Sequence, residues 1–333
     1  MADGRSPSTL ILSRGDVLAL LTLPDCINAV EQAFLLHADG RTLGPGVLGV
    51  PAGAGGFHIK AAGLLGERSY FAAKTNANFP DNARRFGLPT IQGTLVLADA
   101  STGESLAVMD SASVTALRTG AATAVAAKFL ARGEARVATI VGCGVQGEIQ
   151  LAALAAVLPL QRAWVLDTDH ARAEDLAGRA EARLGFRVEA GKDLRSALRA
   201  SDVCVTCTSS RRAFLAAADV APGTFIAAVG ADNQGKQELE PALVASATLV
   251  VDVLEQCAEI GELQHALAAG LITRAQVHAE LARRGGGPSA RPYTGRRDHD
   301  LRQLGHRAAG RRGRHRGLRE GPRGRAWPEG ALR

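Results

Sequence analysis

Residues 135–147 read ARVATIVGCGVQG, and this stretch decides the fold. An apolar strand pattern, ARVATIVG, runs into a G-x-G-x-x-G turn, and the helical pattern QGEIQLAALAAVL follows it. In such a strand–turn–helix unit Gly142 allows the tight turn, Gly144 lets the backbone approach a pyrophosphate, and Gly147 packs the helix against the strand. The helix N-terminus adds free N–H groups and partial positive charge. The stretch therefore predicts a dinucleotide site.

An acid in the next strand supports this prediction. Asp167 ends the strand RAWVLDTD, 25 residues after Gly142. A carboxylate there can accept a hydrogen bond from the adenosine ribose 2′-hydroxyl and repel a 2′-phosphate, which favours NAD over NADP without excluding NADP. Asp169 is a second acid in the same turn. Thr206 and Thr208 follow the strand DVCVTCT, and we expect them at the carboxyl ends of the strands, where the ligand crevice forms; buried strand threonines are the alternative.

The pattern on either side of this unit predicts two domains. Residues 8–40 have helical periodicity, 41–110 read as strands and turns with a hairpin around 101–103, and 113–132 read as an alanine-rich helix. Strands and helices then alternate over about 135–255. The predicted fold class is therefore α/β, with an α+β domain over 1–115 and a Rossmann-type, doubly wound parallel sheet over 116–281.

Residues 282–333 differ from the rest of the chain. They hold 15 Arg, no Lys and 4 acids, whereas residues 1–281 hold 24 Lys and Arg against 29 acids. The body is thus mildly acidic, and we do not expect nucleic acid as its partner. The tail has 11 Gly and 4 Pro, too little apolar surface for a core. Three interpretations stay open: a disordered basic arm, a folded segment, or the out-of-frame translation of a GC-rich gene.

Several classes of protein do not fit the sequence. No apolar run approaches 18 residues, so no membrane span is expected, and the N-terminus lacks the basic-then-apolar layout of a secretory signal. The 5 cysteines have no framework spacing, which indicates a reducing, cytoplasmic compartment. Cys204 and Cys207 lie in a strand pattern where positions i and i+3 face opposite sides, and no other Cys or His grouping has metal-ligand spacing. No metal site is therefore predicted.

Four charged residues suggest a site for a zwitterion. Lys60 in FHIKAAG and Lys74 in YFAAKTN lie in apolar strands, where a lysine is costly to bury without a partner. Arg118 begins the alanine-rich helix, where an early cation suggests an anionic partner and can grip a carboxylate with two hydrogen bonds. Asp232 follows the strand TFIAAVGA and can act as a general base or hold an amine. Lys236 can pair with Asp232 or contact the cofactor.

Seven stretches together resemble the ornithine cyclodeaminase/mu-crystallin family. They are FAAKTNANFPDN, GLPTIQGTLVLADASTG, MDSASVTALRTGAATAVAAKFLAR, ATIVGCGVQG, SDVCVTCTSS, AAVGADNQGKQELEP and GELQHALAAGLI, in this order over about 10–281. The resemblance implies an NAD(P)-dependent enzyme of amino or imino acids that forms a homodimer through the sheet of its first domain. It also implies that Gly144, Val145, Gln146 and Asp167 contact the cofactor.

By the same resemblance Lys74 and Arg118 hold the substrate carboxylate, and Asp232 activates water or handles the amine. The first activity expected is conversion of L-ornithine to L-proline and ammonia. Alanine dehydrogenase, ketimine or pyrroline-2-carboxylate reductase, and a non-catalytic crystallin-like binding protein are the alternatives.

The sequence departs from the family in two places. Family members commonly carry an arginine soon after a proline in the first strand region, where this chain reads GPGVLGVP, and Lys60 is the candidate replacement. Family members also continue into a Ser-Thr-Gly turn and a final helix, and neither is legible after Leu281.

Overall fold

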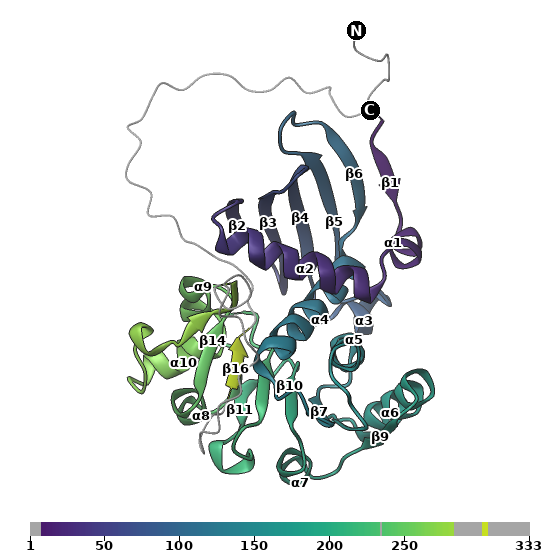
Figure 1. Cartoon of the computed structure of the whole chain (residues 1–333). Helices are drawn as coiled ribbons and strands as arrows, with labels where there is room; N and C mark the ends of the chain where they lie inside the picture. Colours follow the sequence, from purple (N-terminus) through teal and green to yellow (C-terminus); the bar gives the residue numbers. More distant parts are fainter. Residues whose placement is uncertain (1–7, 234, 283–301, 306–333) are drawn as a thin grey trace.

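The computed structural model describes residues 8–233, 235–282 and 302–305, which contain two large sheets joined by a long helix (Figure 1). The first sheet has the order β1-β6-β5-β4-β3-β2. Its strands β2 (Thr42–Ala52), β3 (Gly55–Leu65), β4 (Ser69–Asn78), β5 (Ile91–Asp99) and β6 (Ser105–Asp110) are antiparallel. The hairpin expected around 101–103 is confirmed, because it joins β5 to β6. A short helix, α3 (Asn82–Phe86), lies between β4 and β5.

The prediction of continuous helix over 8–40 is wrong at its start. Leu10–Leu12 form β1, which pairs in parallel with β6. Ser13 then caps α1 (Arg14–Leu20), and Thr22 caps α2 (Leu23–Ala38). Three consecutive apolar residues fit a helix or a strand equally well by periodicity. They form a strand here because they pair with the edge of β6.

The helix that joins the two sheets is α4 (Ser111–Leu130), which corresponds to the helix expected over 113–132. Its N-cap is Asp110, the last residue of β6, and the Asp110 side chain accepts a hydrogen bond from the Ser113 N–H. Small side chains let α4 pack closely on α2 and α5 (Val145–Ala155). A Cβ at Gly120 would lie 2.6 Å from Ile149 Cγ2, so a larger residue there would push the two helices apart.

The second sheet has eight parallel strands in the order β15-β14-β16-β12-β10-β7-β8-β9. They are β7 (Val137–Val141), β8 (Arg162–Leu166), β9 (Arg187–Ala190), β10 (Val203–Thr206), β12 (Phe225–Ala228), β14 (Thr248–Val251), β15 (Ala279–Glu280) and β16 (Arg302–Gly305). The connecting helices are α5, α6 (His170–Leu184), α7 (Leu194–Arg199), α8 (Pro241–Ser246), α9 (Leu254–Glu259) and α10 (Glu262–Ala268). A small two-stranded sheet pairs β11 (Arg211–Leu215) with β13 (Gln237–Leu239). The Rossmann-type sheet predicted from the strand–helix alternation is thereby confirmed.

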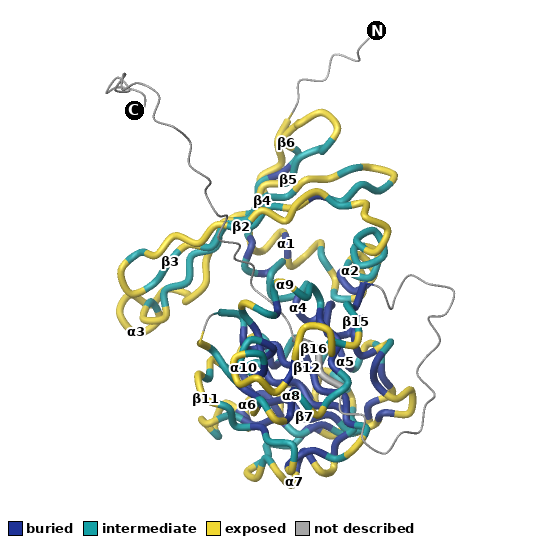
Figure 2. The backbone as a smooth tube through the Cα atoms, turned by 90° about the vertical axis from the view of Figure 1, so that its left-hand side faces the viewer, coloured by how far each residue is buried: buried dark blue, intermediate teal, exposed yellow. Residues whose placement is uncertain are grey.

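The strand order reverses beside β7, because β8 and β9 lie on one side of it and β10 and β12 on the other. Ligands bind at such a switch point, at the carboxyl ends of the strands. The core of this sheet is fully buried and includes Ile140, Leu151 and Phe225. Figure 2 shows that the buried backbone lies mainly here, whereas the six-stranded sheet is largely exposed or half-buried.

One strand comes from the tail. Within 282–333 the structure describes Ala282 and β16, and β16 lies between β12 and β14 and pairs with both. No sequence pattern predicts this strand, because parallel pairing uses backbone N–H and C=O groups that every non-proline residue supplies. The remaining tail residues, and with them the choice among the three interpretations of the tail, lie outside the described residues.

In the part of the chain that the structure describes, no single helix is long and apolar enough to cross a membrane. Helices α1 and α2 are long and apolar enough only when they are taken together, and the chain bends by 84° between them.

Candidate active site

Two neighbouring strands bring Lys60 and Lys74 to one face of the first sheet. Lys60 on β3 lies directly opposite Lys74 on β4, so both side chains project to the same side. Lys74 Nζ donates a hydrogen bond of 3.0 Å to Thr115 Oγ1 on α4. Both lysines are half-buried. Two ammonium groups side by side favour an anion at this face, since like charges directly opposite destabilise a sheet.

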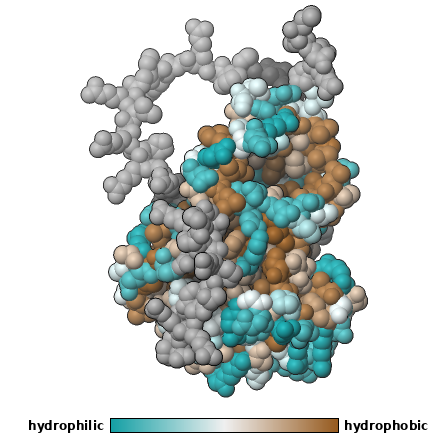
Figure 3. Space-filling model, viewed as in Figure 1, coloured by the Kyte–Doolittle hydropathy of each residue, from teal (hydrophilic) through white to brown (hydrophobic). Residues whose placement is uncertain are grey.

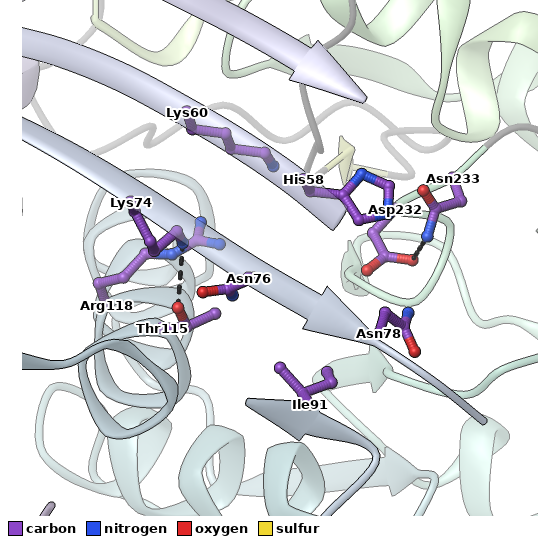
Figure 4. A pocket seen from close by; sticks show the side chains of 10 residues that line it. All are labelled: His58, Lys60, Lys74, Asn76, Asn78, Ile91, Thr115, Arg118, Asp232 and Asn233. Carbon is purple, nitrogen blue, oxygen red and sulfur yellow. Dashed lines mark hydrogen bonds between the residues drawn. The ribbon is translucent and has the colours of Figure 1, made fainter. Parts of the chain in front are cut away.

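Arg118 lies three residues after Thr115 on α4 and faces the same cavity as the two lysines (Figure 4). Burial lowers the pKa of Arg118, while the carboxylates of Asp252 and Asp232 act to raise it. An arginine pKa begins so high that the guanidinium keeps its charge. Three cations from three elements, β3, β4 and α4, thus converge on one cavity.

The cavity between these cations is small, with a volume of about 90 Å³. It is lined by His58, Lys60, Lys74, Asn76, Asn78, Ile91, Thr115, Arg118, Asp232 and Asn233. Figure 4 shows the cationic side chains at one end and Asp232 at the other. We call it the substrate cavity, because its size and its separated charges suit a small zwitterion.

Asp232 enters the substrate cavity from the loop after β12. Its N–H donates to Gly230 O at 2.9 Å, which fixes the turn. Its Oδ1 accepts hydrogen bonds from Lys236 Nζ at 2.6 Å and from Asn233 Nδ2 at 3.3 Å. The side chain of Asp232 remains 45% exposed, so the carboxylate is held in place and still accessible to a ligand. Such a group can accept a proton from an amine or from water.

Sequence reasoning missed His58, Asn76, Asn78 and Thr115. His58 lies two residues before Lys60 on the same strand, and this period of 2 was a usable signal. Burial lowers the pKa of His58, Lys60 lowers it further, and Asp232 acts against both. His58 is therefore neutral at pH 7 and can donate or accept one hydrogen bond near Asp232.

A second, larger cavity lies at the switch point of the parallel sheet and has a volume of about 1050 Å³. Four of the predicted cofactor residues line it, namely Gly142, Gly144, Asp167 and Thr208. We call it the nucleotide cavity. Its volume is at the upper end of the range for small-molecule and cofactor sites.

The glycine turn has the geometry that close packing requires. Gly142 has φ of +104°, and a Cβ there would lie 2.9 Å from Cys207 O. A Cβ at Gly147 would lie 2.0 Å from Gly142 O, whereas nothing lies within 4 Å of one at Gly144. Val145 is exposed and begins α5, and Gln146 Oε1 accepts a hydrogen bond from Gln150 Nε2. Gly144 thus opens toward the cavity and Gly147 supports the turn from behind.

Asp167 is held against the glycine turn. Its two carboxylate oxygens accept hydrogen bonds from the Cys143 N–H at 2.8 Å and from the Asp169 N–H at 3.0 Å. Burial acts to raise the pKa of Asp167, but these N–H groups, the Thr168 hydroxyl and the charge of Arg172 together lower the pKa below its ordinary value. Asp169 instead caps α6 through the Ala171 N–H. Asp167 is therefore the charged acid at the rim of the nucleotide cavity.

The structure separates the two predicted threonines. Thr208 lines the nucleotide cavity, whereas Thr206 is fully buried and its hydroxyl donates to Glu238. For Thr206 the structure therefore shows the alternative, a buried strand threonine. Lys236 pairs with Asp232, the first of its two predicted roles.

The cysteines show no sign of metal or redox chemistry. Cys204 is buried on β10, and burial raises the pKa of both Cys204 and Cys207. A thiolate is therefore disfavoured at both positions. Among the described residues, no group of three or more His, Cys, Asp or Glu side chains is placed to hold a metal ion.

Two characterised enzymes are similar to this chain over most of its length. An alanine dehydrogenase of Archaeoglobus fulgidus is 37% identical over 274 residues, which cover 82% of this chain and 83% of that protein. An iminosuccinate reductase of Paracoccus denitrificans is 35% identical over 276 residues, covering 80% and 83%.

The fold has close counterparts among solved structures. An archaeal alanine dehydrogenase dimer with bound NAD has a TM-score of 0.83 at 35% identity and covers 89% of this chain and 90% of its own. A Thermococcus litoralis Δ(1)-pyrroline-2-carboxylate reductase in complex with NADH and L-proline has a TM-score of 0.82 at 28% identity, covering 91% and 92%. The model of the ornithine cyclodeaminase/mu-crystallin family matches residues 8–301. The chain belongs to the ornithine cyclodeaminase/mu-crystallin family.

Proposed function

We propose that this protein is an NAD-dependent oxidoreductase that interconverts a small α-amino acid and its imino or keto acid. One observation carries the proposal: Lys60, Lys74, Arg118 and Asp232 line one small cavity. The cations suit a carboxylate, and Asp232 suits an amine, so an amino acid is oriented by both of its charged groups. The relatives named above are enzymes of alanine, iminosuccinate and pyrroline-2-carboxylate, which are substrates of this kind.

The nucleotide cavity has the features that NAD requires. The N-terminus of α5, begun by Gly144, suits the pyrophosphate, and we propose Val145 and Gln146 as its neighbours in that contact. Asp167 suits the ribose hydroxyls. When bound, NAD supplies a nicotinamide ring that accepts or gives a hydride. The two kinds of solved complex named above hold NAD or NADH.

The chain's own residues have separable roles in this reaction. We propose that Arg118 and Lys74 hold the carboxylate, with Lys60 beside them. Asp232 takes the proton from the substrate amine in one direction and stabilises the protonated imine in the other. Neutral His58 can donate a hydrogen bond without adding charge to the cavity. Holding both ends of the substrate restricts its α-carbon to one orientation.

Cyclodeamination of ornithine is less well supported by this cavity. That reaction brings a second ammonium group into the site, and a carboxylate is the usual partner for such a group. Among the described residues that line the cavity, Asp232 is the one acid, and three cations face it. The other residues that line the cavity are neutral, namely His58, Asn76, Asn78, Ile91, Thr115 and Asn233. A substrate with a single amine is therefore the better match.

A steady-state assay tests the proposed reaction. With NAD and a panel of small amino acids, we expect NADH to accumulate in proportion to the product, and with NADH and imino acids we expect NADH to be consumed. Formation of proline from ornithine without net NADH would instead identify a cyclodeaminase. Tight binding of NADH without turnover of any substrate would indicate a non-catalytic binding protein.

Replacing Asp167 tests the choice of cofactor. In Asp167→Ser we expect NADH to bind about tenfold more weakly, because the ribose loses a charged acceptor. NADPH binding should improve relative to NADH, because the carboxylate no longer repels a 2′-phosphate. Fluorescence titration of both cofactors measures the two dissociation constants. Asp175→Ser on the exposed face of α6 is the matched control, and equal effects of both variants would contradict the role of Asp167.

We also propose the division of labour between the two parts of the chain. Residues 1–115 form the substrate-binding and dimerisation domain, and 116–281 form the NAD-binding domain. Strands β2, β3 and β4 of the six-stranded sheet leave large apolar side chains exposed, among them Leu48, Val50, Phe57 and Phe71. Figure 3 shows apolar surface in the upper part of the molecule, where this sheet lies. Covering this surface with a second copy of the chain makes a homodimer.

A further inference from the structure

Glu238 is a buried acid that the proposed reaction does not use. It lies on β13, its side chain is fully buried, and its carboxylate accepts four hydrogen bonds. Three come from the last residue of β10 and the loop after it: from Thr206 Oγ1, the Thr208 N–H and Thr208 Oγ1, each at 2.7 Å. The fourth comes from the Gly230 N–H at 2.9 Å, in the loop after β12. One carboxylate therefore links the loops that follow the paired strands β10 and β12, at the carboxyl ends of the sheet.

Each of these loops carries one half of the site. Thr208 lines the nucleotide cavity, and its loop also packs against Gly142 of the glycine turn. Gly230 leads to Asp232, because Gly230 O accepts hydrogen bonds from the Asp232 N–H at 2.9 Å and from Lys236 Nζ at 3.4 Å. The distance between the cofactor and the catalytic acid thus depends on how the two loops are held together.

The shape of the contact requires a carboxylate. Oε1 accepts the Thr208 N–H and Oε2 accepts the Gly230 N–H, so each oxygen has a backbone donor. An amide in place of the carboxylate would turn its NH₂ group toward one of these N–H donors. The Gly230 N–H also donates to Thr206 O at 3.2 Å. This second acceptor reduces the repulsion between an amide NH₂ group and the Gly230 N–H but does not remove it. A Cβ at Gly230 would lie 2.4 Å from the Glu238 carboxyl carbon, so the fit leaves no room for a side chain.

We propose that Glu238 is a positioning residue, which clamps the Thr208 loop to the Gly230–Asp232 loop and so sets the geometry between cofactor and catalytic acid. The inference rests on the proposed function for the role of Asp232, and on the fold alone for the clamp. Burial raises the pKa of Glu238, and its four donors act against this shift. Removing the clamp should change cofactor binding and turnover together.

Glu262 provides a matched control. It is buried on α10, and its two oxygens accept the N–H groups of Glu238 at 2.7 Å and Leu239 at 3.2 Å. It therefore resembles Glu238 in chemistry and burial, but the hydrogen bonds of its carboxyl group go to the backbone of β13 and not to the crevice loops. Burial raises the pKa of Glu262 to about 8. A change at Glu262 tests the general cost of losing a buried carboxyl in this region.

The experiment compares Glu238→Gln with Glu262→Gln in the full chain. In Glu238→Gln we expect the NADH dissociation constant to rise about fivefold and kcat to fall about tenfold, in line with the loss of one buried charged hydrogen bond. Glu262→Gln should leave both quantities within about twofold of wild type, even if its free energy of unfolding falls as much as that of Glu238→Gln. Equal losses in the two variants, or unchanged values in Glu238→Gln, would overturn the clamp.

Two further measurements keep the test decisive. Thr206→Val serves as a second variant should Glu238→Gln fail to fold. It removes one buried donor to Glu238 at a residue that lines neither cavity. We expect the NADH dissociation constant to rise and kcat to fall, each about threefold. Hydrogen exchange at the Thr208 and Gly230 amides needs no ligand, and it should quicken in Glu238→Gln and not in Glu262→Gln. If the wild type binds NADH but turns over no substrate, the proposed function fails while the exchange and NADH measurements still decide the clamp.

Discussion

Asp232→Asn is expected to lower kcat about a thousandfold, because the amide keeps the shape of the side chain but cannot take a proton from the substrate amine. The NADH dissociation constant should stay within about twofold of wild type, since Asp232 lines the substrate cavity and not the nucleotide cavity. Steady-state kinetics and NADH fluorescence titration measure the two effects separately. We therefore expect a protein that binds NADH normally but converts its substrate very slowly.

Glu240→Gln is the control for this variant. Glu240 is an exposed acid in the same region of the chain, just after β13, and it lines neither cavity. Its replacement should leave kcat unchanged. A kcat for Asp232→Asn close to that of wild type would show that the proton is handled elsewhere, and His58 would then be the next residue to replace.

Arg118→Ala is expected to raise the KM for the carboxylate substrate about a hundredfold or more, because truncating one partner of a buried charge pair costs several kcal/mol. Arg118→Lys should recover only part of the loss, since an ammonium cannot make the paired hydrogen bonds of a guanidinium. Initial rates over a range of substrate concentrations measure the effect. Binding of NADH, which does not use Arg118, should change little.

Lys128→Ala is the matched control for Arg118, because Lys128 lies on the same helix and pairs with Glu31 at the surface. Such exposed pairs contribute about 0–1 kcal/mol, so the KM should stay near that of wild type. A substrate analogue with an amide in place of the carboxylate sharpens the comparison. If Arg118→Ala affected the amide and the acid equally, the arginine would not be holding the carboxylate.

The nucleotide-binding half was predictable from sequence because its signals are local. The stretch 135–147 contains strand, turn and helix in one run, and the structure follows it as β7, the Gly142 turn and α5. Charged residues in apolar strands, Lys60 and Lys74, also stood out, because burial of a lysine needs an explanation wherever it occurs.

The rest of the site depends on pairing that no local pattern reveals. Asn76 and Asn78 join the cavity because β4 pairs with β3 and β5 in a particular register, and a shift of one residue would turn them away. Glu238 looks like an ordinary surface acid in KQELEP, and only the approach of two distant loops makes it a buried acceptor. Leu10–Leu12 fit a helical pattern as well as a strand, because three residues are too few to define a period.

The position of β16 bears on how the protein is made. Strands β12 and β14 are close in sequence, yet each pairs with β16, whose residues are synthesised more than fifty positions after β14. Strands β7, β8, β9, β10 and β12 are contiguous in the sheet and are complete once residue 228 has left the ribosome. The crevice can therefore take shape during translation, whereas β14 pairs with its neighbour β16 only when residue 305 emerges.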